Sequence, residues 1–262
     1  MSNRTSDEGV RGVVRTWLAA TGTLVSFPML PLVVLLASEG SLYGGFGGIA
    51  LWGYVATAAV CVLAPLRFPE ELAVSRAIVV LPVFRLVDLT MPTFDGGPHV
   101  RVVIVYVILA VAVGVLVARA HPRWADFQRP ELLWLPAMLP IAVGLAYAGY
   151  LLVGTAPTLA TTLAADATTT ILVVVLVALV EEPVFRGALQ GRLQERLTPA
   201  VGLVVASVVY GAMHAALSPE AAAFGLVSGL VFGLVYWYWD SIALPTLLHA
   251  LVGVLAHTVV PL

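Results

Sequence analysis

Runs of about 20 apolar residues recur along most of this chain, the length that a helix needs to cross the hydrocarbon core of a bilayer. Hydrophobic residues make up 60% of the sequence and charged residues only 11%, whereas soluble domains usually carry about a quarter charged residues. A water-soluble fold of 262 residues has too little interior to hide so much apolar surface. The sequence therefore predicts an integral membrane protein in contact with the lipid bilayer.

Cutting the chain at this length predicts an all-α, polytopic transmembrane helix bundle with eight or nine spans. The third span is the weakest because it carries Arg76, Arg85 and Asp88. It either crosses the bilayer with its charges paired or lies at the interface as an amphipathic helix. The predicted spans cover residues 17–37, 46–65, 72–90, 101–118, 132–153, 166–186, 200–217, 219–239 and 242–260.

The positions of the arginines predict the orientation, because short cytoplasmic loops keep an excess of positive charge. With nine spans and a cytoplasmic N-terminus, the outside segments hold only Arg101. If the third segment lies at the interface, the spans before it have the opposite orientation relative to the spans after it. The inside segments would hold Arg4, Arg11, Arg15, Arg67, Arg119, Arg123, Arg129, Arg186, Arg192 and Arg196.

No long linker divides the chain, so we expect one membrane domain. Residues 1–16 form a polar cytoplasmic N-terminus, residues 17–165 the N-terminal transmembrane helices, and residues 166–262 a C-terminal group of helices. The first apolar run continues to about Ala37, long enough to span, which favours a retained helix over a cleaved signal. The net charge is only -2 and no basic patch is present, which argues against a nucleic-acid partner.

An acidic pair interrupts the apolar run of the sixth predicted span. Glu181 and Glu182 follow the run directly and precede Pro183. Charges inside a bilayer are costly, and a proline there must kink or loosen the helix. Glu182 precedes Arg186 by four residues, the favoured order for an ion pair on one helix face, which leaves Glu181 as a free carboxylate and candidate general base. Taken alone, the pair could equally mark the interface between membrane and water, with the side chain of Arg186 extending to the surface beside it.

The next apolar span brings His214 level with Glu181. If the helix of Glu181 continues through Leu193 and turns at Thr198 and Pro199, the following helix runs back antiparallel. Glu181 lies 17 residues before Thr198, and His214 lies 15 residues after Pro199. At ~1.5 Å per residue both lie about 23–25 Å from the turn. A lone histidine in an apolar helix is more often an interhelical hydrogen-bonding partner, but at this depth it becomes a candidate partner of the glutamate.

His249 is a third polar group, in the last apolar segment and just beyond Pro245. Its distance from the local turn does not match that of His214 by the same counting. Tilt or a partly unwound entry is therefore needed to bring the two histidines together. His257 lies near the end of the sequence and is expected at the interface.

Other intramembrane protease signatures are missing from the sequence. It has no His-Glu-x-x-His of a zinc protease and no Gly-x-Gly-Asp of the aspartyl type. Ser228 lacks the rhomboid-type Gly-x-Ser spacing, so we interpret it as a small packing residue. Gly225, Gly229 and Gly233 fall four residues apart, which favours the close approach of a neighbouring helix.

Three motifs in the C-terminal part occur in a characteristic order. Two glutamates, three variable residues and an arginine come first, an aromatic residue four places before a histidine comes second, and a further histidine comes third. In this order they resemble the CPBP family of CAAX proteases and bacteriocin-processing enzymes, also called the ABI family. The residues that carry the resemblance are Glu181, Glu182, Arg186, Tyr210, His214 and His249.

The chain departs from the family pattern at two positions. Tyr210 stands where the second motif has phenylalanine, and Gly253 stands where the third motif has asparagine. Asn3 is the only asparagine in the sequence, so no other can take over. The resemblance covers residues 168–262, and the first 150 residues match only as generic membrane helices.

The resemblance implies an endopeptidase of the type II CAAX prenyl endopeptidase kind. In it, Glu181 and His214 hold and deprotonate a water, and His249 stabilises the oxyanion. Glu182 and Arg186 complete the catalytic motif. One glutamate and two histidines also suit a divalent metal such as zinc. Glu181, His214 and His249 are therefore candidate ligands of a metal-dependent enzyme. The alternative is a glutamate-dependent enzyme that works without metal.

Our first hypothesis is thus an intramembrane endopeptidase that acts on a peptide or protein substrate in the membrane. The second is a catalytically degenerate binding or immunity protein of the same scaffold, which Gly253 favours. A proton or solute transporter would use the same carboxylates as a relay, but inverted repeats that would support it are not seen in the sequence. Prenylated peptides and bacteriocin leaders are both open as substrates, and the oligomeric state is not determined.

Overall fold

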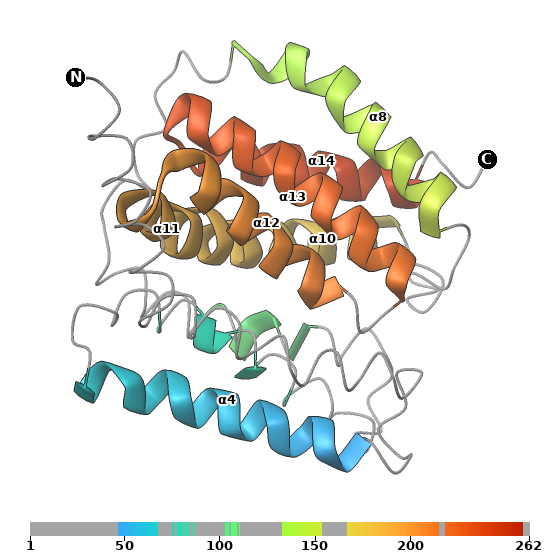
Figure 1. Cartoon of the computed structure of the whole chain (residues 1–262). Coiled ribbons are helices and arrows are strands. Elements are labelled where there is room, and N and C mark those ends of the chain that lie inside the picture. The colour runs from blue at the N-terminus through green and yellow to red at the C-terminus, as the bar shows by residue number, and fades with distance from the viewer. Residues whose placement is uncertain are drawn as a thin grey trace, which may run out of the picture.

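The computed structural model shows a bundle of helices whose C-terminal part carries the predicted motifs (Figure 1). All regular structure among the described residues is helical. The polar N-terminus, the first predicted span and most of the third and fourth lie outside these residues. Described are residues 47–67, 75, 78–80, 82, 83, 86, 103, 104, 106–108, 110, 133–153, 167–214 and 218–258. The helices are α4 (Gly47–Arg67), α8 (Leu135–Val153), α10 (Ala167–Glu182), the π-helix η4 (Pro183–Gln190), α11 (Gly191–Arg196), α12 (Pro199–His214), α13 (Pro219–Trp239) and α14 (Ala243–Thr258).

Three of the helices are long and apolar enough to cross a bilayer, which supports a protein integral to the membrane. They are Leu135–Val153, Thr168–Arg196 and Pro219–Trp239, and three shorter apolar helices are Leu51–Leu66, Pro199–His214 and Ala243–His257. All six begin within a few residues of predicted spans. The predicted total of eight or nine spans is not confirmed, because the described part of the chain provides three of full length.

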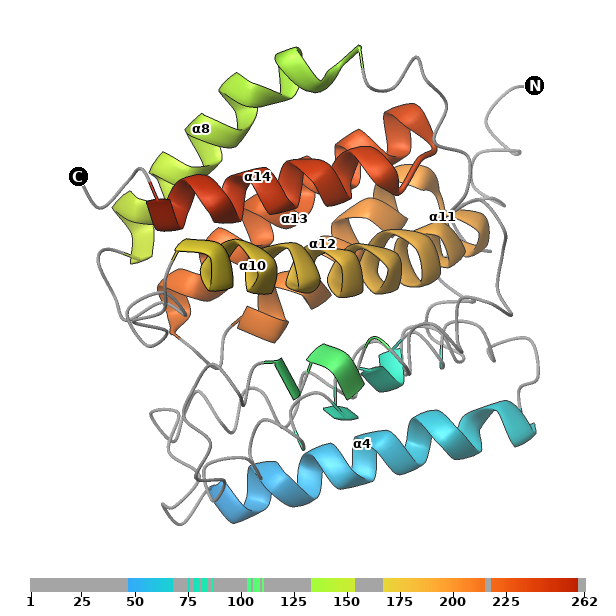
Figure 2. The same ribbon diagram turned by 180° about the vertical axis from the view of Figure 1, so that it is seen from behind.

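The helix that carries the glutamate pair loosens at Pro183, as the sequence predicted. A proline has no N–H to offer to the preceding turn, and its ring crowds the carbonyl four residues back. From Pro183 to Gln190 the backbone forms a π-helix, in which hydrogen bonds join residues five apart. Figure 2 shows that α10, η4 and α11 nevertheless form one continuous rod. The loosened segment therefore begins directly after Glu182, within this rod.

The rod ends in the turn that the sequence placed at Thr198 and Pro199. The Thr198 hydroxyl accepts a hydrogen bond from the Val201 N–H at 3.3 Å, and Pro199 opens α12. Proline suits this first helical position because its missing N–H would have no partner there. Helix α12 then packs back against α11 and η4, so the predicted helix hairpin is confirmed.

Helix α13 presents the predicted glycine stripe to α12, the helix against which it packs most extensively. A Cβ atom added at Gly225 would lie 3.0 Å from Nδ1 of His214. One added at Gly229 would lie 3.1 Å from Cδ1 of Tyr210. The small residues thus leave room for motif side chains of α12, which explains the spacing seen in the sequence.

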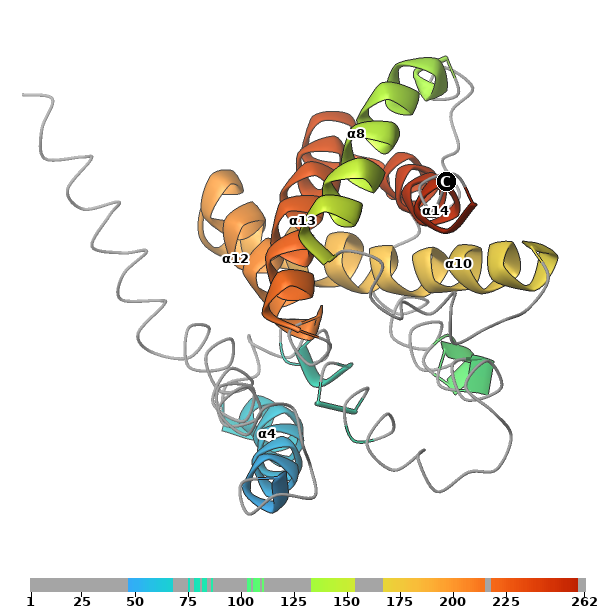
Figure 3. The same ribbon diagram turned by 90° about the vertical axis from the view of Figure 1, so that its right-hand side faces the viewer.

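Helix α14 completes the C-terminal bundle by packing against α8, α10 and α13 (Figure 3). It follows a short non-helical link, in which Asp240 adopts a left-handed conformation with φ 49° and ends α13. Met138, Phe232 and Leu248 belong to the core that α8, α13 and α14 share. A second core joins α10, η4, α11 and α12 to short described segments between α4 and the bundle. The motif side chains come from η4 and the three helices α10, α12 and α14.

Candidate active site

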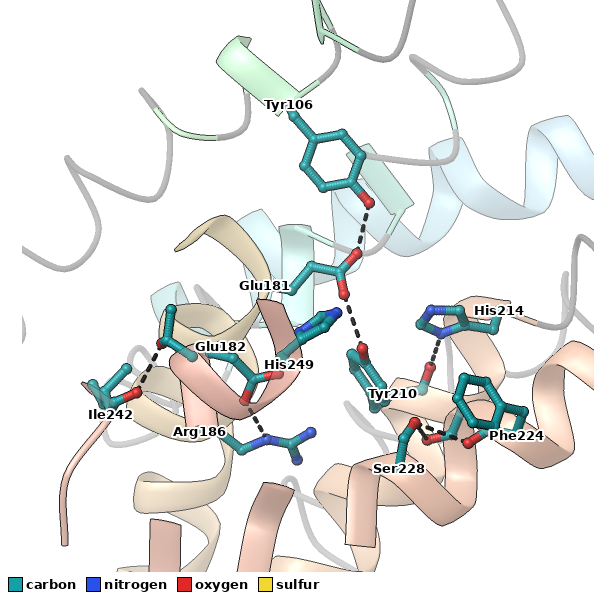
Figure 4. A network of polar contacts seen from close by, with 12 residues as sticks. Tyr106, Glu181, Glu182, Arg186, Tyr210, His214, Phe224, Ser228, Ile242 and His249 are labelled. Atoms are coloured by element: carbon teal, nitrogen blue, oxygen red, sulfur yellow. Dashed lines mark hydrogen bonds and ion pairs between the residues drawn. The ribbon is translucent and has the colours of Figure 1, made fainter. Parts of the chain in front are cut away.

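Glu182 holds two partners, one on each oxygen of its carboxylate (Figure 4). Arg186 Nε lies 2.9 Å from Oε2, and His249 Nδ1 lies 2.9 Å from Oε1. Glu182 and Arg186 are both fully buried, at 0% exposure. The ion pair predicted from the spacing of four residues is therefore confirmed, and the histidine is a partner that the spacing did not predict.

Arg186 keeps part of its hydrogen-bonding capacity unused. Its two terminal guanidinium nitrogens are buried and have no hydrogen-bond partner among the described residues. The guanidinium carbon lies 5.0 Å from the centre of the Tyr210 ring, within the range of a cation–π contact. Glu182 is thus the only anionic group that Arg186 contacts in the described part of the chain.

Glu181 accepts hydrogen bonds from two tyrosine hydroxyl groups. The Tyr106 hydroxyl donates to Oε1 at 2.6 Å, and the Tyr210 hydroxyl donates to Oε2 at 3.0 Å. Figure 4 shows the carboxylate between the two phenol rings. Our prediction of a free carboxylate was wrong in this respect: Glu181 has no cationic partner among the described residues, but both of its oxygens are occupied. A buried carboxylate needs such donors because water is largely excluded from it.

Tyr106 was missed by the sequence analysis. It lies in the fourth predicted span, within the apolar run of residues 102–113, where its hydroxyl is the only side-chain donor. A hydroxyl group inside such a run needs a buried partner, and this was the signal that could have drawn attention to it. No spacing rule connects a residue of that span with Glu181, since 75 positions separate the two.

His214 lies one helical turn beyond the residue that contacts Glu181. Its Nδ1 atom lies 3.0 Å from the Tyr210 carbonyl oxygen, and the two rings are 4.7 Å apart. Tyr210, one turn closer to the start of α12, donates its hydroxyl hydrogen bond to the Glu181 carboxylate. The π-helix explains the offset, since a helix with more residues per turn rises less per residue. Glu181 therefore lies closer to the turn than an α-helical count suggests.

His249 is directed at Glu182 and packs against two aromatic rings. Its ring stacks on Phe232 with centroids 5.0 Å apart, and it meets the Tyr210 ring edge to face at 6.3 Å. Because an ionised carboxylate only accepts hydrogen bonds, we infer that Nδ1 carries the proton and that Nε2 faces away from Glu182. A non-helical link at residues 240–242 precedes α14, and whether tilt or an unwound entry brings the two histidines together stays a prediction.

Gly253 leaves no space for the side chain that the family pattern has at this position. A Cβ atom added there would overlap Cγ1 of Val174, a buried residue of α10. Valine is branched at Cβ and stiff in a helix, so it cannot easily turn aside. Helices α10 and α14 thus approach closely where an asparagine is expected.

The candidate metal ligands do not form a metal site in this arrangement. No group of three or more His, Cys, Asp or Glu side chains converges among the described residues. Glu181 accepts from two hydroxyls, and His249 directs Nδ1 at Glu182. A zinc ion needs about four ligands at once, and the described donor set does not provide them. We therefore derive no chemistry through a metal.

Apolar helices enclose a buried glutamate pair in this part of the protein, and two histidines lie in neighbouring helices. Residues 163–255 match the family model described as type II CAAX prenyl endopeptidase Rce1-like. The match agrees with the resemblance of this part of the chain to the CPBP family of CAAX proteases that the motifs indicated. The matched range includes Glu181 and His249 and excludes Tyr106. No curated protein and no solved structure matches the chain.

Proposed function

We propose that this protein is an intramembrane endopeptidase in which Glu181 is the general base. His214 helps Glu181 to hold the attacking water, and His249 stabilises the oxyanion. Glu182 and Arg186 position His249 through their buried network. The support comes from the family match and from the arrangement of the two glutamates.

The observation that carries this proposal is the different environment of two adjacent carboxylates. Glu182 is bound to an arginine and a histidine, so both of its oxygens take part in contacts that stabilise the fold. Glu181 receives only hydroxyl donors. Each carboxylate oxygen has a second lone pair, so Glu181 still has capacity to accept a water. A base must lie within about 2.6–3.2 Å of the proton that it removes, and we assign this role to Glu181 because, unlike Glu182, it is not held by an arginine among the described residues.

The proposed reaction is the hydrolysis of a peptide bond. Glu181 takes a proton from water as the water oxygen attacks the carbonyl carbon, and the carbonyl π electrons move to its oxygen. When the tetrahedral intermediate collapses, the C=O bond forms again, the C–N bond breaks, and the amine nitrogen takes the proton from Glu181. The products are a carboxylic acid and an amine, and Glu181 returns to its initial state.

The family description points to a substrate with a prenylated C-terminus. We extend this to the present chain as part of the proposal, because a substrate with an isoprenoid group enters the bilayer with its scissile bond near the surface. A suitable assay substrate is a quenched fluorescent peptide that ends in farnesylcysteine and three further residues. The same peptide without the farnesyl group tests whether the lipid is recognised.

The test is turnover of these peptides by the purified protein in lipid nanodiscs. We expect Glu181→Gln to lower kcat by about 10²–10⁴-fold, the usual contribution of a general base, and His214→Ala to lower it as well. Glu195→Gln on α11 and His257→Ala on α14 are the matched controls, since neither side chain contacts the site. Equal turnover by Glu181→Gln and the native protein would refute the proposal.

The close contact between Gly253 and Val174 favours a second candidate function. If the missing asparagine abolishes hydrolysis, the chain is a binding or immunity protein that uses the same pocket of polar groups to hold a membrane segment. In that case the native protein would bind the farnesylated peptide without cleaving it. Gly253→Asn combined with Val174→Ala, which removes the overlapping methyl group, would then create turnover.

A further inference from the structure

Tyr210 is the residue on which the proposed site converges. Its side chain is 2% exposed, and its ring contacts Phe185, Arg186 and His214, with ring centroids 4.9 and 4.7 Å from those of Phe185 and His214. Among the described residues its hydroxyl group makes one hydrogen bond, to Oε2 of Glu181 at 3.0 Å. The aromatic ring alone would provide all of the packing. The hydroxyl group is therefore an addition to the family pattern that the packing does not require.

One of the two departures from that pattern removes a hydrogen-bond donor and the other adds one. At Gly253 the chain lacks a side-chain amide that would donate hydrogen bonds, and Val174 closes the space. At Tyr210 it gains an O–H donor beside the proposed base. A site for peptide hydrolysis needs donors about 2.7–3.1 Å from the developing oxyanion. One donor is lost on α14 and another is present on α12.

We propose that the Tyr210 hydroxyl replaces the missing asparagine as a hydrogen-bond donor to the oxyanion. This inference rests on the endopeptidase function proposed above. In the resting site the hydroxyl donates to Oε2 of Glu181. When Glu181 takes the proton of the water, its carboxyl group becomes a weaker acceptor, and the negative charge moves to the substrate carbonyl oxygen. The same O–H group then turns from Glu181 to the oxyanion.

The geometry of the site supports this transfer. The attacking water must contact Glu181, and the carbonyl oxygen is bonded to the carbon that the water attacks. The oxyanion therefore develops close to a hydroxyl that is already 3.0 Å from the carboxylate, and this O–H group can turn about its C–O bond while the packed ring stays in place. Tyr106 donates to the other oxygen at 2.6 Å, so Glu181 stays anchored while Tyr210 moves. His249 is the second donor to the oxyanion in its doubly protonated form, in which Nδ1–H stays on Glu182 and Nε2–H faces the oxyanion.

Tyr210→Phe is the test, since it removes the hydroxyl and restores the residue that the family pattern has. With the farnesylated quenched peptide, we expect kcat to fall about 10²–10³-fold, the usual effect of losing one oxyanion donor, with KM changed only a few-fold. A phosphinate isostere of that peptide mimics the charged tetrahedral intermediate, and its Kd should rise by a similar factor. Tyr238→Phe, at a residue 78% exposed, is the matched control.

A donor restored elsewhere should repair the defect. We expect that adding Val174→Ala and Gly253→Asn to Tyr210→Phe raises the kcat of that variant at least tenfold. Full kcat in Tyr210→Phe, or unchanged affinity of this variant for the phosphinate, would overturn the inference. Recovery below tenfold in the folded triple variant would also overturn it, because Tyr210 would then act only by positioning Glu181.

The same experiment separates failure of the inference from failure of the proposed function. If the native protein is inactive and the variant with Val174→Ala and Gly253→Asn is active, the scaffold is that of a protease but Tyr210 does not compensate. If no variant cleaves any peptide, the proposed function itself is wrong, and the role of Tyr210 with it.

Discussion

Replacing Glu182 by glutamine should destabilise the protein strongly, because the carboxylate faces two donors. Arg186 Nε and His249 Nδ1 each lie 2.9 Å from a different oxygen of Glu182. Glutamine keeps the shape of glutamate but offers one oxygen acceptor and one NH2 donor. In either orientation of the amide, one of the two partners therefore faces another donor.

The expected loss follows from the burial of the pair. Removing one partner of a buried ion pair costs about 3–5 kcal/mol, because the remaining charge has no compensation. Arg186 is 0% exposed, and its two terminal nitrogens have no hydrogen-bond partner among the described residues that could take over. We therefore expect Glu182→Gln to lower the free energy of unfolding by an amount in this range.

The assay is unfolding by SDS in mixed detergent micelles, followed by tryptophan fluorescence. Glu195→Gln is the matched control, since Glu195 pairs with Arg192 at 2.7 Å and both side chains are partly exposed. Such a pair contributes about 0–1 kcal/mol. Adding Arg186→Met to Glu182→Gln should restore much of the loss, because it removes the uncompensated charge. A loss as small as that of the control, or a double variant less stable than the single one, would refute the reasoning.

Three further predictions concern the surroundings of the site. Tyr106→Phe removes the 2.6 Å hydrogen bond to Glu181, so stability should fall by about 1.5–3 kcal/mol in the same assay, and no loss would contradict the contact. Gly229→Ala forces a Cβ atom to 3.1 Å from Tyr210 and should cost about 1–3 kcal/mol, whereas Gly144→Ala, with open space around it, should not destabilise α8. Turnover should survive dialysis against a chelator, since the described donors form no metal site; loss of turnover that zinc restores would show the opposite.

Helix positions and the ion pair were predictable because they depend on local rules. Apolar run length located α13 at residues 219–239, the bounds that the structure has. A spacing of four residues identified the pair of Glu182 and Arg186, and Pro183 identified the loosened helix. In the last two cases the relevant residues lie within one or two turns, so the backbone geometry of a helix determines their relation.

The partners of Glu181 were not predictable because they depend on how far the π-helix departs from α-helical rise. An α-helical count placed His214 at the depth of Glu181, and the structure shows that Tyr210, one turn earlier in α12, donates to the carboxylate. The sequence indicates that a proline loosens the helix, but it does not indicate over how many residues. The contact between Gly253 and Val174 likewise depends on the distance between α10 and α14, which no periodicity specifies.

The contact between Tyr106 and Glu181 bears on how the chain is organised. The family match begins at residue 163, so Tyr106 belongs to the preceding part of the sequence, yet its hydroxyl donates to the carboxylate that we propose as the base. A buried carboxylate that loses such a donor must find another partner or water. The matched segment alone therefore does not contain a complete environment for Glu181. The division into domains stays a prediction; in the single membrane domain that we predict, the N-terminal helices would help to form the site as well as to anchor it.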